Sequence, residues 1–381
     1  SDLWEGTNKE YLNYQDALKS NFNQQPFEVV SKKLLEELNE DYSYTGTYDY
    51  VFIDEAQDFG INFFRLVLKT LKQNGHMIYA YDELQSLKKE ISIPGKDMIF
   101  ENESDCKDIN LATSYRAPLE ILTTAHAIGM GIYRKVKDDE NPIVNFVDEN
   151  TLIDMGYENI TNEFKAGNMV DLRRKNESKS GIEIDEPMLF ENSTSQYKQL
   201  AKDIMNLLKT QDVLPEDIMI VDLHNSQLMN NHEEFSFYFE KELEEYGLNN
   251  CYHVRLVSSK TPSMRIVKNA INYTSVFRAK GNEANLVFVI NCNRVNLDRN
   301  VTYRNEIFTA MTRAKVWLYG SNVKFLADEI QEIKNNDYHL KFIYPTEEQK
   351  KTIRFLGTKE EKIESKVETA EELSIEILEA I

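Results

Sequence analysis

The chain has few of the residues that build metal sites and disulfide frameworks, with 3 cysteines and 6 histidines among 381 residues. Cys106, Cys251 and Cys292 lie far apart, no CxxC pair is present, and the histidines show no ligand spacing. Buried thiols account for such cysteines better than a zinc site or disulfides do. The pattern indicates a reducing, cytoplasmic setting.

Long apolar runs and excess positive charge are also missing. No segment approaches the roughly 20 apolar residues that span a bilayer, and nothing resembles a signal peptide, so no membrane contact is expected. Lys and Arg number 44 against 64 Asp and Glu, a net charge of -20. A broad basic face for duplex nucleic acid is therefore not expected. A narrow basic groove is still compatible with this charge, because phosphate contacts are short-range at cellular salt.

What is present favours an α/β protein of two domains. Hydrophobic residues make up 41% of the chain and aromatic residues 11%, enough for two cores in 381 residues. Apolar strands alternate with helical periodicity, which predicts parallel sheet covered on both faces. We expect strands at 48–53, 76–81, 187–190, 217–222, 251–257, 285–290 and 316–319, and helices at 26–38, 63–72, 118–133, 196–209, 235–246 and 305–315.

Two carboxylates follow the first predicted strand, in the string YDYVFIDEAQDF at 48–59. The carboxyl ends of strands in open α/β sheets are where ligands bind. In a nucleotide hydrolase the first carboxylate holds Mg²⁺ and the second orients the attacking water, and Asp54 and Glu55 have this arrangement. An apolar strand that ends in Asp-Glu also arises by chance, but the full string DEAQD is much rarer.

A second polar string, YAYDELQSL at 79–87, follows the next predicted strand. Gln85 could hydrogen-bond a γ-phosphate or the water beside it. The alternative is structural, since Asp82 is a good residue to cap a helix start. By itself this string favours neither interpretation.

Three further strings carry candidate phosphate contacts. LATSYRAP at 111–118 offers the stacking face of Tyr115 and the charged fork of Arg116, although a Tyr-Arg pair is more often a surface pair. TSVFRAKGNEANLVFVIN at 274–291 turns through Gly281, where a glycine permits close backbone approach. NEIFTAMTRAKVWLYG at 305–320 places Arg313 near a helix end, where it could act as an arginine finger.

The order of these five strings resembles motifs II to VI of superfamily 1 (UvrD/Rep/PcrA-like) DNA helicases, over roughly residues 48–345. The phrases FIDEAQDF, SYRAPLEILTTAHAIGMGIYR, VFRAKGNEA and RNEIFTAMTRAK are most similar to bacterial members that often carry a nuclease-related domain. The resemblance implies two RecA-like parallel-sheet domains that clamp ATP, the first of them incomplete. We expect a partial first domain at 1–136, a connection at 137–185, a second domain at 186–345 and an acidic tail at 346–381.

The resemblance also implies roles for individual residues. The bound cofactors would be ATP and Mg²⁺, and the substrate single-stranded DNA, with RNA as the alternative. Asp54 would ligate Mg²⁺ and Glu55 would activate water. The other implied contacts are Gln85, Arg116 and Arg313 with the γ-phosphate, Tyr115 with adenine, Glu283 with ribose, and Asp82 as a further nucleotide-site residue. Candidate nucleic-acid contacts near strand ends are Tyr81, Arg278 and Lys280.

The sequence departs from this family at its phosphate cradle. A Walker A motif has the pattern GxxxxGK[ST], whereas Gly95-Lys96 is followed by Asp97 and position 90 is Glu. Phe277 also stands where the family has a histidine, and the interval from Arg116 to Ser275 is too short for a large inserted duplex-binding lobe. We therefore expect a C-terminal fragment, a partner chain that supplies the P-loop, or a degenerate relative. In the fragment, residues 1–47 would pack at the open sheet edge.

The predicted function is an ATP-dependent DNA helicase or translocase motor, a hydrolase in the full-length protein, that is inactive as the isolated chain. The alternative, favoured by the acidic surface and the missing Walker A motif, is a non-catalytic helicase-like module that binds nucleic acid or protein. A metal nuclease that uses Asp54, Glu55 and Asp82 is a poorer third interpretation, because no lysine is suitably placed and the helicase motif order explains the same acids.

Overall fold

The structure is a computed structural model, and contacts divide it into two compact units. Unit 1 comprises Ser1–Asp108 with Leu356–Ile381, and unit 2 comprises Ile109–Phe355. The structure describes residues 16–17, 26–40, 46–87, 99, 107, 109, 111, 113–136, 141–161, 163–175, 187–192, 196–211, 213–258, 266–293 and 301–355. The acidic tail beyond residue 355, Cys106 and the Gly-Lys pair at 95–96 lie outside these ranges.

Unit 1 is built on a parallel β-α-β unit. Strands β1 (Tyr48–Ile53) and β2 (Leu71–Tyr79) pair in parallel and are connected through helix α4 (Ile61–Thr70). One face of the strand pair packs on α4, where Ile53, Phe64 and Val67 form a buried cluster. The prediction of two strands with an intervening helix is confirmed, although α4 begins and ends two residues earlier than expected.

Helix α3 (Pro26–Glu40) packs on α4 and not on a sheet edge. Its Leu34 and Leu38 bury themselves against Leu66. The N-cap of α4 is Gly60, which has no side chain to cap the helix, and the Glu28 carboxylate accepts the Asn62 N–H at 3.0 Å instead. The expectation that residues 1–47 pack at the open sheet edge is therefore wrong for α3, because its apolar side chains pack on α4.

The opposite face of the two strands carries large exposed side chains. Tyr50 and Phe52 of β1 pair with His76 and Ile78 of β2, and Phe52 is 72% exposed while Ile78 is 50% exposed. Parallel sheets normally carry helices on both faces. In the part of unit 1 that the structure describes, only the face toward α4 has such cover.

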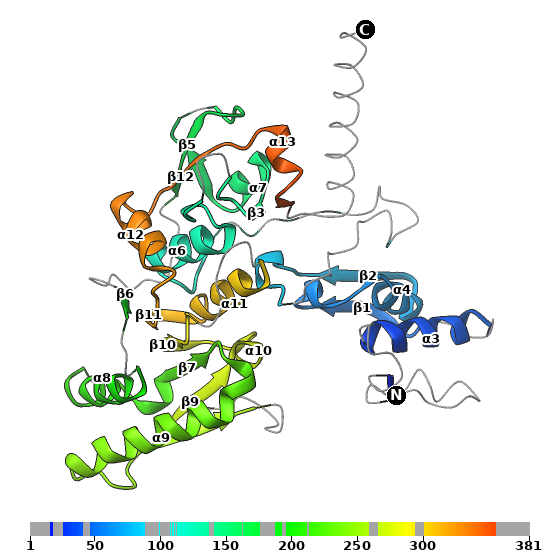
Figure 1. Ribbon diagram of the computed structural model, residues 1–381. Helices are drawn as coiled ribbons and strands as arrows, with labels where there is room; N and C mark the ends of the chain where they lie inside the picture. The colour runs from blue at the N-terminus through cyan, green and yellow to red at the C-terminus, as the bar shows by residue number, and fades with distance from the viewer. Residues whose placement is uncertain are drawn as a thin grey trace. The chain divides into compact units, whose positions relative to one another are not determined.

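Unit 2 contains a six-stranded, wholly parallel sheet in the order β6-β11-β10-β7-β9-β8. Helices α8 and α9 cover one face, and α11 and α6 lie on the other (Figure 1). The strands are β6 (Met188–Glu191), β7 (Ile218–Asp222), β8 (His253–Val257), β9 (Ala270–Ser275), β10 (Ala284–Ile290) and β11 (Ala314–Ser321). The helices are α6 (Leu119–Met130), α8 (Gln196–Thr210), α9 (Leu228–Glu245), α10 (Val276–Ala279) and α11 (Val301–Met311).

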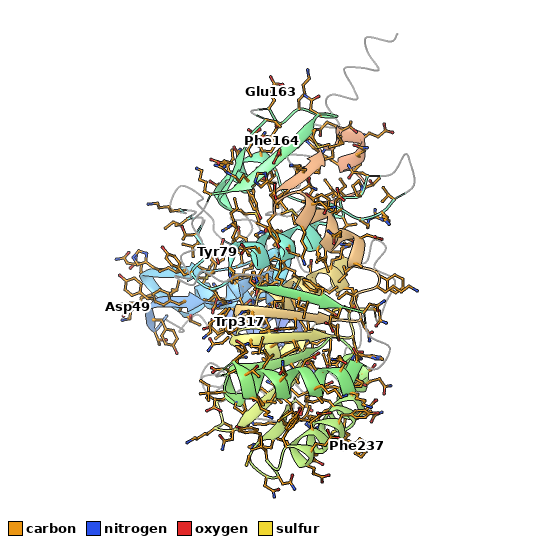
Figure 2. All side chains as sticks on the ribbon, turned by 90° about the vertical axis from the view of Figure 1, so that its left-hand side faces the viewer. Asp49, Tyr79, Glu163, Phe164, Phe237 and Trp317 are labelled. Carbon is orange, nitrogen blue, oxygen red and sulfur yellow. The ribbon has the colours of Figure 1, made fainter. Side chains whose placement is uncertain are left out.

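The core of this sheet confirms the predicted α/β class. Strands β7 and β9 are buried along their whole length, as expected for central parallel strands covered on both sides. Phe235 and Phe239 of α9 stack at 5.8 Å in the core cluster. Trp317 lies among the strands, whereas Phe237 points outward from α9 (Figure 2), where it is 52% exposed.

Residues 137–185, expected as a connection, contribute ordered elements to unit 2. They include β3 (Asn145–Phe146), α7 (Glu149–Asp154), β4 (Tyr157–Asn159) and β5 (Met169–Arg174). Strand β5 is the centre of an antiparallel sheet between β4 and β12 (Leu340–Ile343), and β3 pairs with β13 (Arg354–Phe355). The remaining helices are α12 (Ala327–Asn335) and α13 (Glu347–Lys350).

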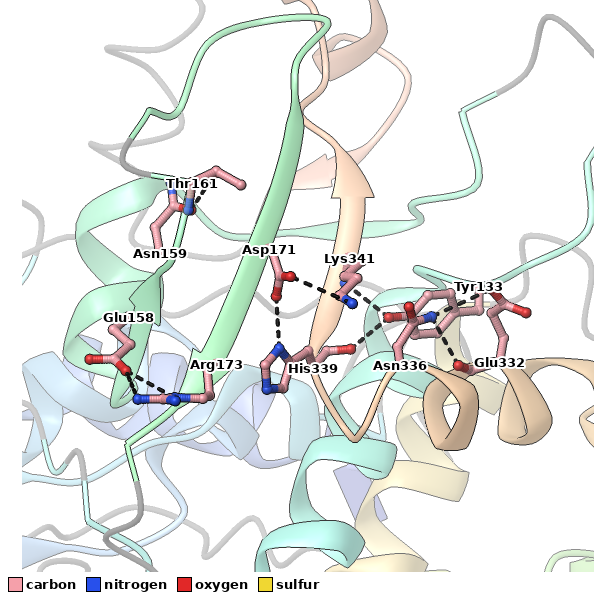
Figure 3. Close-up of polar contacts among 10 residues, drawn as sticks. All are labelled: Tyr133, Glu158, Asn159, Thr161, Asp171, Arg173, Glu332, Asn336, His339 and Lys341. Atoms are coloured by element: carbon pink, nitrogen blue, oxygen red, sulfur yellow. Dashed lines mark hydrogen bonds and ion pairs between the residues drawn. The ribbon is translucent and has the colours of Figure 1, made fainter.

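Polar contacts fix the antiparallel sheet to its neighbours (Figure 3). The Asp171 carboxylate of β5 contacts the His339 ring at 2.9 Å and the Lys341 ammonium at 3.6 Å. The Tyr133 hydroxyl donates to the His339 carbonyl at 2.6 Å and accepts the Lys341 N–H at 2.9 Å. Burial raises the pKa of Tyr133 to about 12. These contacts connect the end of the α6 region with β12.

Helix α6 belongs to unit 2, which begins at Ile109, whereas the first domain was expected to extend to residue 136. The reason is the packing of α6 against α11. The buried Arg304 guanidinium of α11 donates to the Ile128 carbonyl at 2.7 Å and pairs with Glu329 at 2.8 Å. Pro118 is the N-cap of α6, so the helix begins one residue later than the expected residue 118.

Candidate functional site

The predicted acids of unit 1 gather at one edge of its strand pair. Asp54 and Glu55 directly follow β1, and Tyr81 and Asp82 follow β2. Because the strands are parallel, their carboxyl ends share an edge. Two backbone hydrogen bonds hold the ends together, from Ala80 N–H to the Ile53 carbonyl at 2.8 Å and from Ala56 N–H to the Ala80 carbonyl at 2.9 Å.

Glu55 has a left-handed backbone, with φ 53° and ψ 41°. For a residue with a side chain this conformation costs on the order of 1–2 kcal/mol, and such strain clusters at functional sites. The Glu55 N–H is held by the Asp54 carboxylate at 2.9 Å. The Asp54 carboxylate thus holds the backbone of the turn in which Glu55 lies, directly after β1.

Gln57 connects the two strand ends through its buried amide. The side chain is 1% exposed. Its Nε2 donates to the Glu55 carboxylate at 2.5 Å, and its Oε1 accepts the Asp82 N–H at 3.1 Å. Glu55 and Asp82, on separate loops, are therefore bridged by one side chain.

Asp82 has the structural role that the sequence analysis offered for this string, as the cap of a short helical turn. Its Oδ1 accepts the Leu84 N–H at 3.0 Å and so caps the short helical turn η2 (Glu83–Gln85). Its Oδ2 accepts the Gln85 side-chain amide at 2.8 Å. The cap orients Asp82, and Asp82 in turn orients Gln85. Beside it, Tyr81 is 44% exposed and stacks on Tyr79.

Unit 2 brings three predicted motifs together around Glu283. The Glu283 carboxylate pairs with Arg116 at 2.8 Å and with Lys315 at 3.4 Å. These groups are half-exposed, so the cluster contributes only about 0–1 kcal/mol per pair to folding. Tyr115, adjacent to Arg116, is 69% exposed and presents an open aromatic face.

Arg313 is buried at the start of β11, next to the loop that carries Glu283. Its side chain is 1% exposed. The guanidinium donates to the Thr309 carbonyl at 2.9 Å, to the Thr312 hydroxyl at 3.1 Å and to the Asn282 carbonyl at 3.4 Å. These contacts fix the fork to its own helix end and to the residue that precedes Glu283.

The loop after β9 contains the remaining candidates. Arg278 lies in α10 and Lys280 is its C-cap, and both are partly exposed at the carboxyl end of β9. The Asn282 side chain donates to the carbonyls of Arg278 and Lys280. Gly281 has φ 77° and open space where a Cβ would lie. A glycine is therefore favoured at this position by its backbone conformation.

Sequence reasoning missed two residues, Gln57 and Lys315. Gln57 was part of the quoted string DEAQD, and its position two residues after Glu55 is the signal that could have identified it. Lys315 follows Arg313 in TAMTRAK, but its contact with Glu283 depends on the pairing of β10 with β11, which brings Ala284 next to Ala314.

Comparisons with known proteins support the motif assignment in unit 2. Residues 271–319 match the family model of the UvrD-like helicase C-terminal domain, a segment that contains Arg278, Lys280, Glu283 and Arg313. The chain thus resembles the C-terminal portion of UvrD-like superfamily 1 helicases, as its motifs predict. No curated protein matches the chain.

Among solved structures, the chain is similar to the C-terminal domain of a possible DNA helicase from Lactobacillus plantarum WCFS1. The identity is 17% and the TM-score 0.27, with 38% of this chain and 80% of that chain covered. Within the described ranges, no helix is long and apolar enough to cross a membrane. The same ranges hold no cluster of three or more His, Cys, Asp or Glu suited to a metal ion.

Proposed function

We propose that this chain supplies most of the ATP-hydrolysing machinery of a superfamily 1 DNA translocase, and that its phosphate cradle comes from a segment outside this sequence or from a partner chain. The observation that carries the proposal is the hydrogen-bonded edge of unit 1. There Asp54 is exposed at a strand end, and Glu55 is held in a strained turn by a buried amide.

In this proposal unit 1 provides the metal and water contacts. Mg²⁺ binds hard oxygen ligands and commonly takes one or two carboxylates together with substrate phosphates. The exposed Asp54 fits this role as a single carboxylate. Bound Mg²⁺ would neutralise charge on the phosphates of ATP. Glu55 accepts a proton from the attacking water, and Gln85 donates its amide toward the terminal phosphate.

Unit 2 provides the cationic and aromatic contacts. Arg116 and Arg313 carry fixed charges suited to phosphate oxygens, and Tyr115 offers an exposed face for a base. Glu283, which pairs with Arg116, holds that guanidinium or accepts a ribose hydroxyl. The burial of Arg313 in its own helix end fits an arginine whose position is set before nucleotide binds, which is how preorganised charge stabilises a transition state.

The exposed face of the strand pair, which no described element of unit 1 covers, supports the part of the proposal that concerns the missing phosphate cradle. Phe52 and Ile78 are large, apolar and at least half exposed on a parallel strand pair. A strand, loop and helix of the P-loop type would supply cover of the kind that parallel sheets have.

Single-stranded DNA would contact the strand ends near Tyr81, Arg278 and Lys280.

A second candidate is a non-catalytic module that binds nucleic acid or protein with the same scaffold. The absence of a Walker A motif and the net charge of -20 favour it. The two candidates differ in ATP hydrolysis. Only the motor hydrolyses ATP, and it needs both the acidic edge of unit 1 and Arg313 of unit 2 for that reaction.

The test is ATP hydrolysis by the native protein, isolated from its cells through an affinity tag on this chain, with and without single-stranded DNA. The motor predicts DNA-stimulated hydrolysis that falls about a hundredfold or more in both Glu55→Gln and Arg313→Ala. Thr70→Val, which removes a buried hydroxyl contact in α4, should leave the rate unchanged. DNA binding without hydrolysis would favour the non-catalytic module.

A further inference from the structure

Gln57 is a buried polar residue whose side chain connects two loops by hydrogen bonds. It lies in the short turn η1 (Ala56–Asp58), 1% exposed, between the loops that follow β1 and β2. A buried amide must find partners for its polar atoms, since an unmade hydrogen bond costs about 1–3 kcal/mol. Gln57 uses its donor on Glu55 and its acceptor on the backbone of Asp82.

The contacts continue on both sides of Gln57. Beyond Glu55, the carboxylate of Asp54 accepts the Glu55 N–H. Beyond Asp82, the Asp82 carboxylate accepts the Gln85 amide. A continuous path of hydrogen bonds thus runs from the proposed Mg²⁺ ligand, through the proposed base, to the proposed γ-phosphate contact.

We infer that Gln57 is a positioning residue that holds the Glu55 carboxylate in place and connects it to the Asp82–Gln85 loop. This inference rests on the proposed function. The chemistry favours an amide here because the side chain must donate to a carboxylate and accept from an N–H at the same time. Glutamate, leucine or methionine at this position would lose at least one of the two contacts.

The connection has a consequence for how the site responds to nucleotide. Glu55 is in a left-handed conformation and is restrained by Gln57. A displacement of Gln85 as it meets a phosphate would shift Asp82, and Gln57 would transmit that shift to Glu55. Positioning of the water-activating carboxylate would then depend on the presence of the terminal phosphate.

The first experiment measures steady-state ATP hydrolysis by the native tagged protein with DNA present. Gln57→Met keeps the length of the side chain but removes both hydrogen bonds. We expect kcat to fall about tenfold to a hundredfold while KM for ATP stays within about twofold, because a displaced general base affects the chemical step and leaves substrate binding intact. Thr70→Val is the matched buried control. If the wild-type protein hydrolyses ATP and Gln57→Met has the same kcat, the positioning role is overturned and the proposed function stands.

The second experiment needs no activity and measures hydrogen exchange of the Asp82 amide in this chain. Gln57→Met should accelerate that exchange about tenfold, the factor equivalent to about 1.4 kcal/mol for one lost hydrogen bond. Glu55→Ala should also accelerate the exchange, because the Gln57 amide then loses the acceptor that holds it beside Asp82. Thr70→Val should have no effect. If the native protein has no ATPase activity, the proposed function fails, and unchanged Asp82 exchange in both variants would separately overturn the connection.

Gln57→Glu separates the two halves of the contact and covers the case in which Gln57→Met does not fold. When ionised, the new carboxylate retains the acceptor for the Asp82 N–H, loses the donor to Glu55 and adds a second negative charge beside it, so this variant is assayed at alkaline pH, where the two carboxylates do not share a proton. We expect Asp82 exchange near the wild-type rate together with a lowered kcat. Wild-type kcat in this variant would show that the donor to Glu55 has no positioning role.

Discussion

Acidification should destabilise unit 2 through His126, which lies buried in α6. Its ring stacks on Phe308 at 5.5 Å, and its Nδ1 hydrogen-bonds the Tyr157 hydroxyl at 2.7 Å. Burial, with a smaller contribution from the positive charge of Arg174, lowers the pKa of His126 from 6.5 to about 3. The folded protein therefore keeps this imidazole neutral over a range in which the unfolded chain protonates it.

The sign of the effect follows from proton linkage. Below pH 6.5 the unfolded state binds a proton that the folded state does not bind, so the free energy of unfolding decreases as pH falls from 6.5 toward about 3. Well inside this window the slope is about 1.4 kcal/mol per pH unit. Between pH 6.5 and 4.5 the expected loss from His126 is about 2 kcal/mol.

The assay is urea unfolding of unit 2 at pH 6.5, 5.5 and 4.5, with His126→Gln as the test variant. Glutamine can still contact the Tyr157 hydroxyl but does not titrate, so its stability should be about 2 kcal/mol less sensitive to this pH change. His253→Gln, at an exposed position of β8, is the matched histidine control. Equal pH dependence in the wild type and in His126→Gln would show that protonation of His126 does not drive the loss of stability.

Three further predictions concern stability and can be measured by urea unfolding. Arg304→Met leaves the buried Glu329 carboxylate without its partner and should cost about 3–5 kcal/mol, much of which Glu329→Leu should restore in the double variant; additive losses would contradict this. Gly320→Ala would place a methyl group against the Phe190 ring and should cost about 1–3 kcal/mol, whereas no loss would mean that the ring moves freely. Glu283→Gln removes a half-exposed ion pair with Arg116 and should change stability by less than about 1 kcal/mol; a larger loss would show that the pair is structural.

The sequence predicted the local elements well because their causes are local. Alternation of apolar strands and amphipathic helices was sufficient to predict the parallel sheet of unit 2, and β7, with its five buried residues, is an example. The acidic edge was also predictable, since Asp54 and Asp82 each follow an apolar strand. Parallel pairing of β1 with β2 then placed them at one edge.

The parts that the sequence did not predict depend on contacts between distant segments. Strand β12, near residue 340, pairs with β5, near residue 170, and neither strand has a pattern that specifies the other. Helix α6 was expected in the first domain by motif order, but Arg304 of α11 ties its end to unit 2. The role of Gln57 also required the fold, because its partners lie on two loops that only strand pairing brings together.

The family match at 271–319 includes Glu283 and Arg313 but not the acidic edge of unit 1. The assignment of Asp54 and Glu55 therefore depends on their motif and on the geometry of their strand ends. An experiment on turnover must perturb both segments to test whether they act in one reaction.

The most direct evidence for translocation would be the number of ATP molecules hydrolysed per DNA-binding event by the native tagged protein, as a function of the length of single-stranded DNA. A translocase hydrolyses more ATP on longer strands, because each molecule moves further before it dissociates. We expect this increase in the wild type and in Thr70→Val, and its loss in Glu55→Gln and in Arg313→Ala. Hydrolysis that is absent, independent of DNA length, or unaffected by both substitutions would contradict the proposed function.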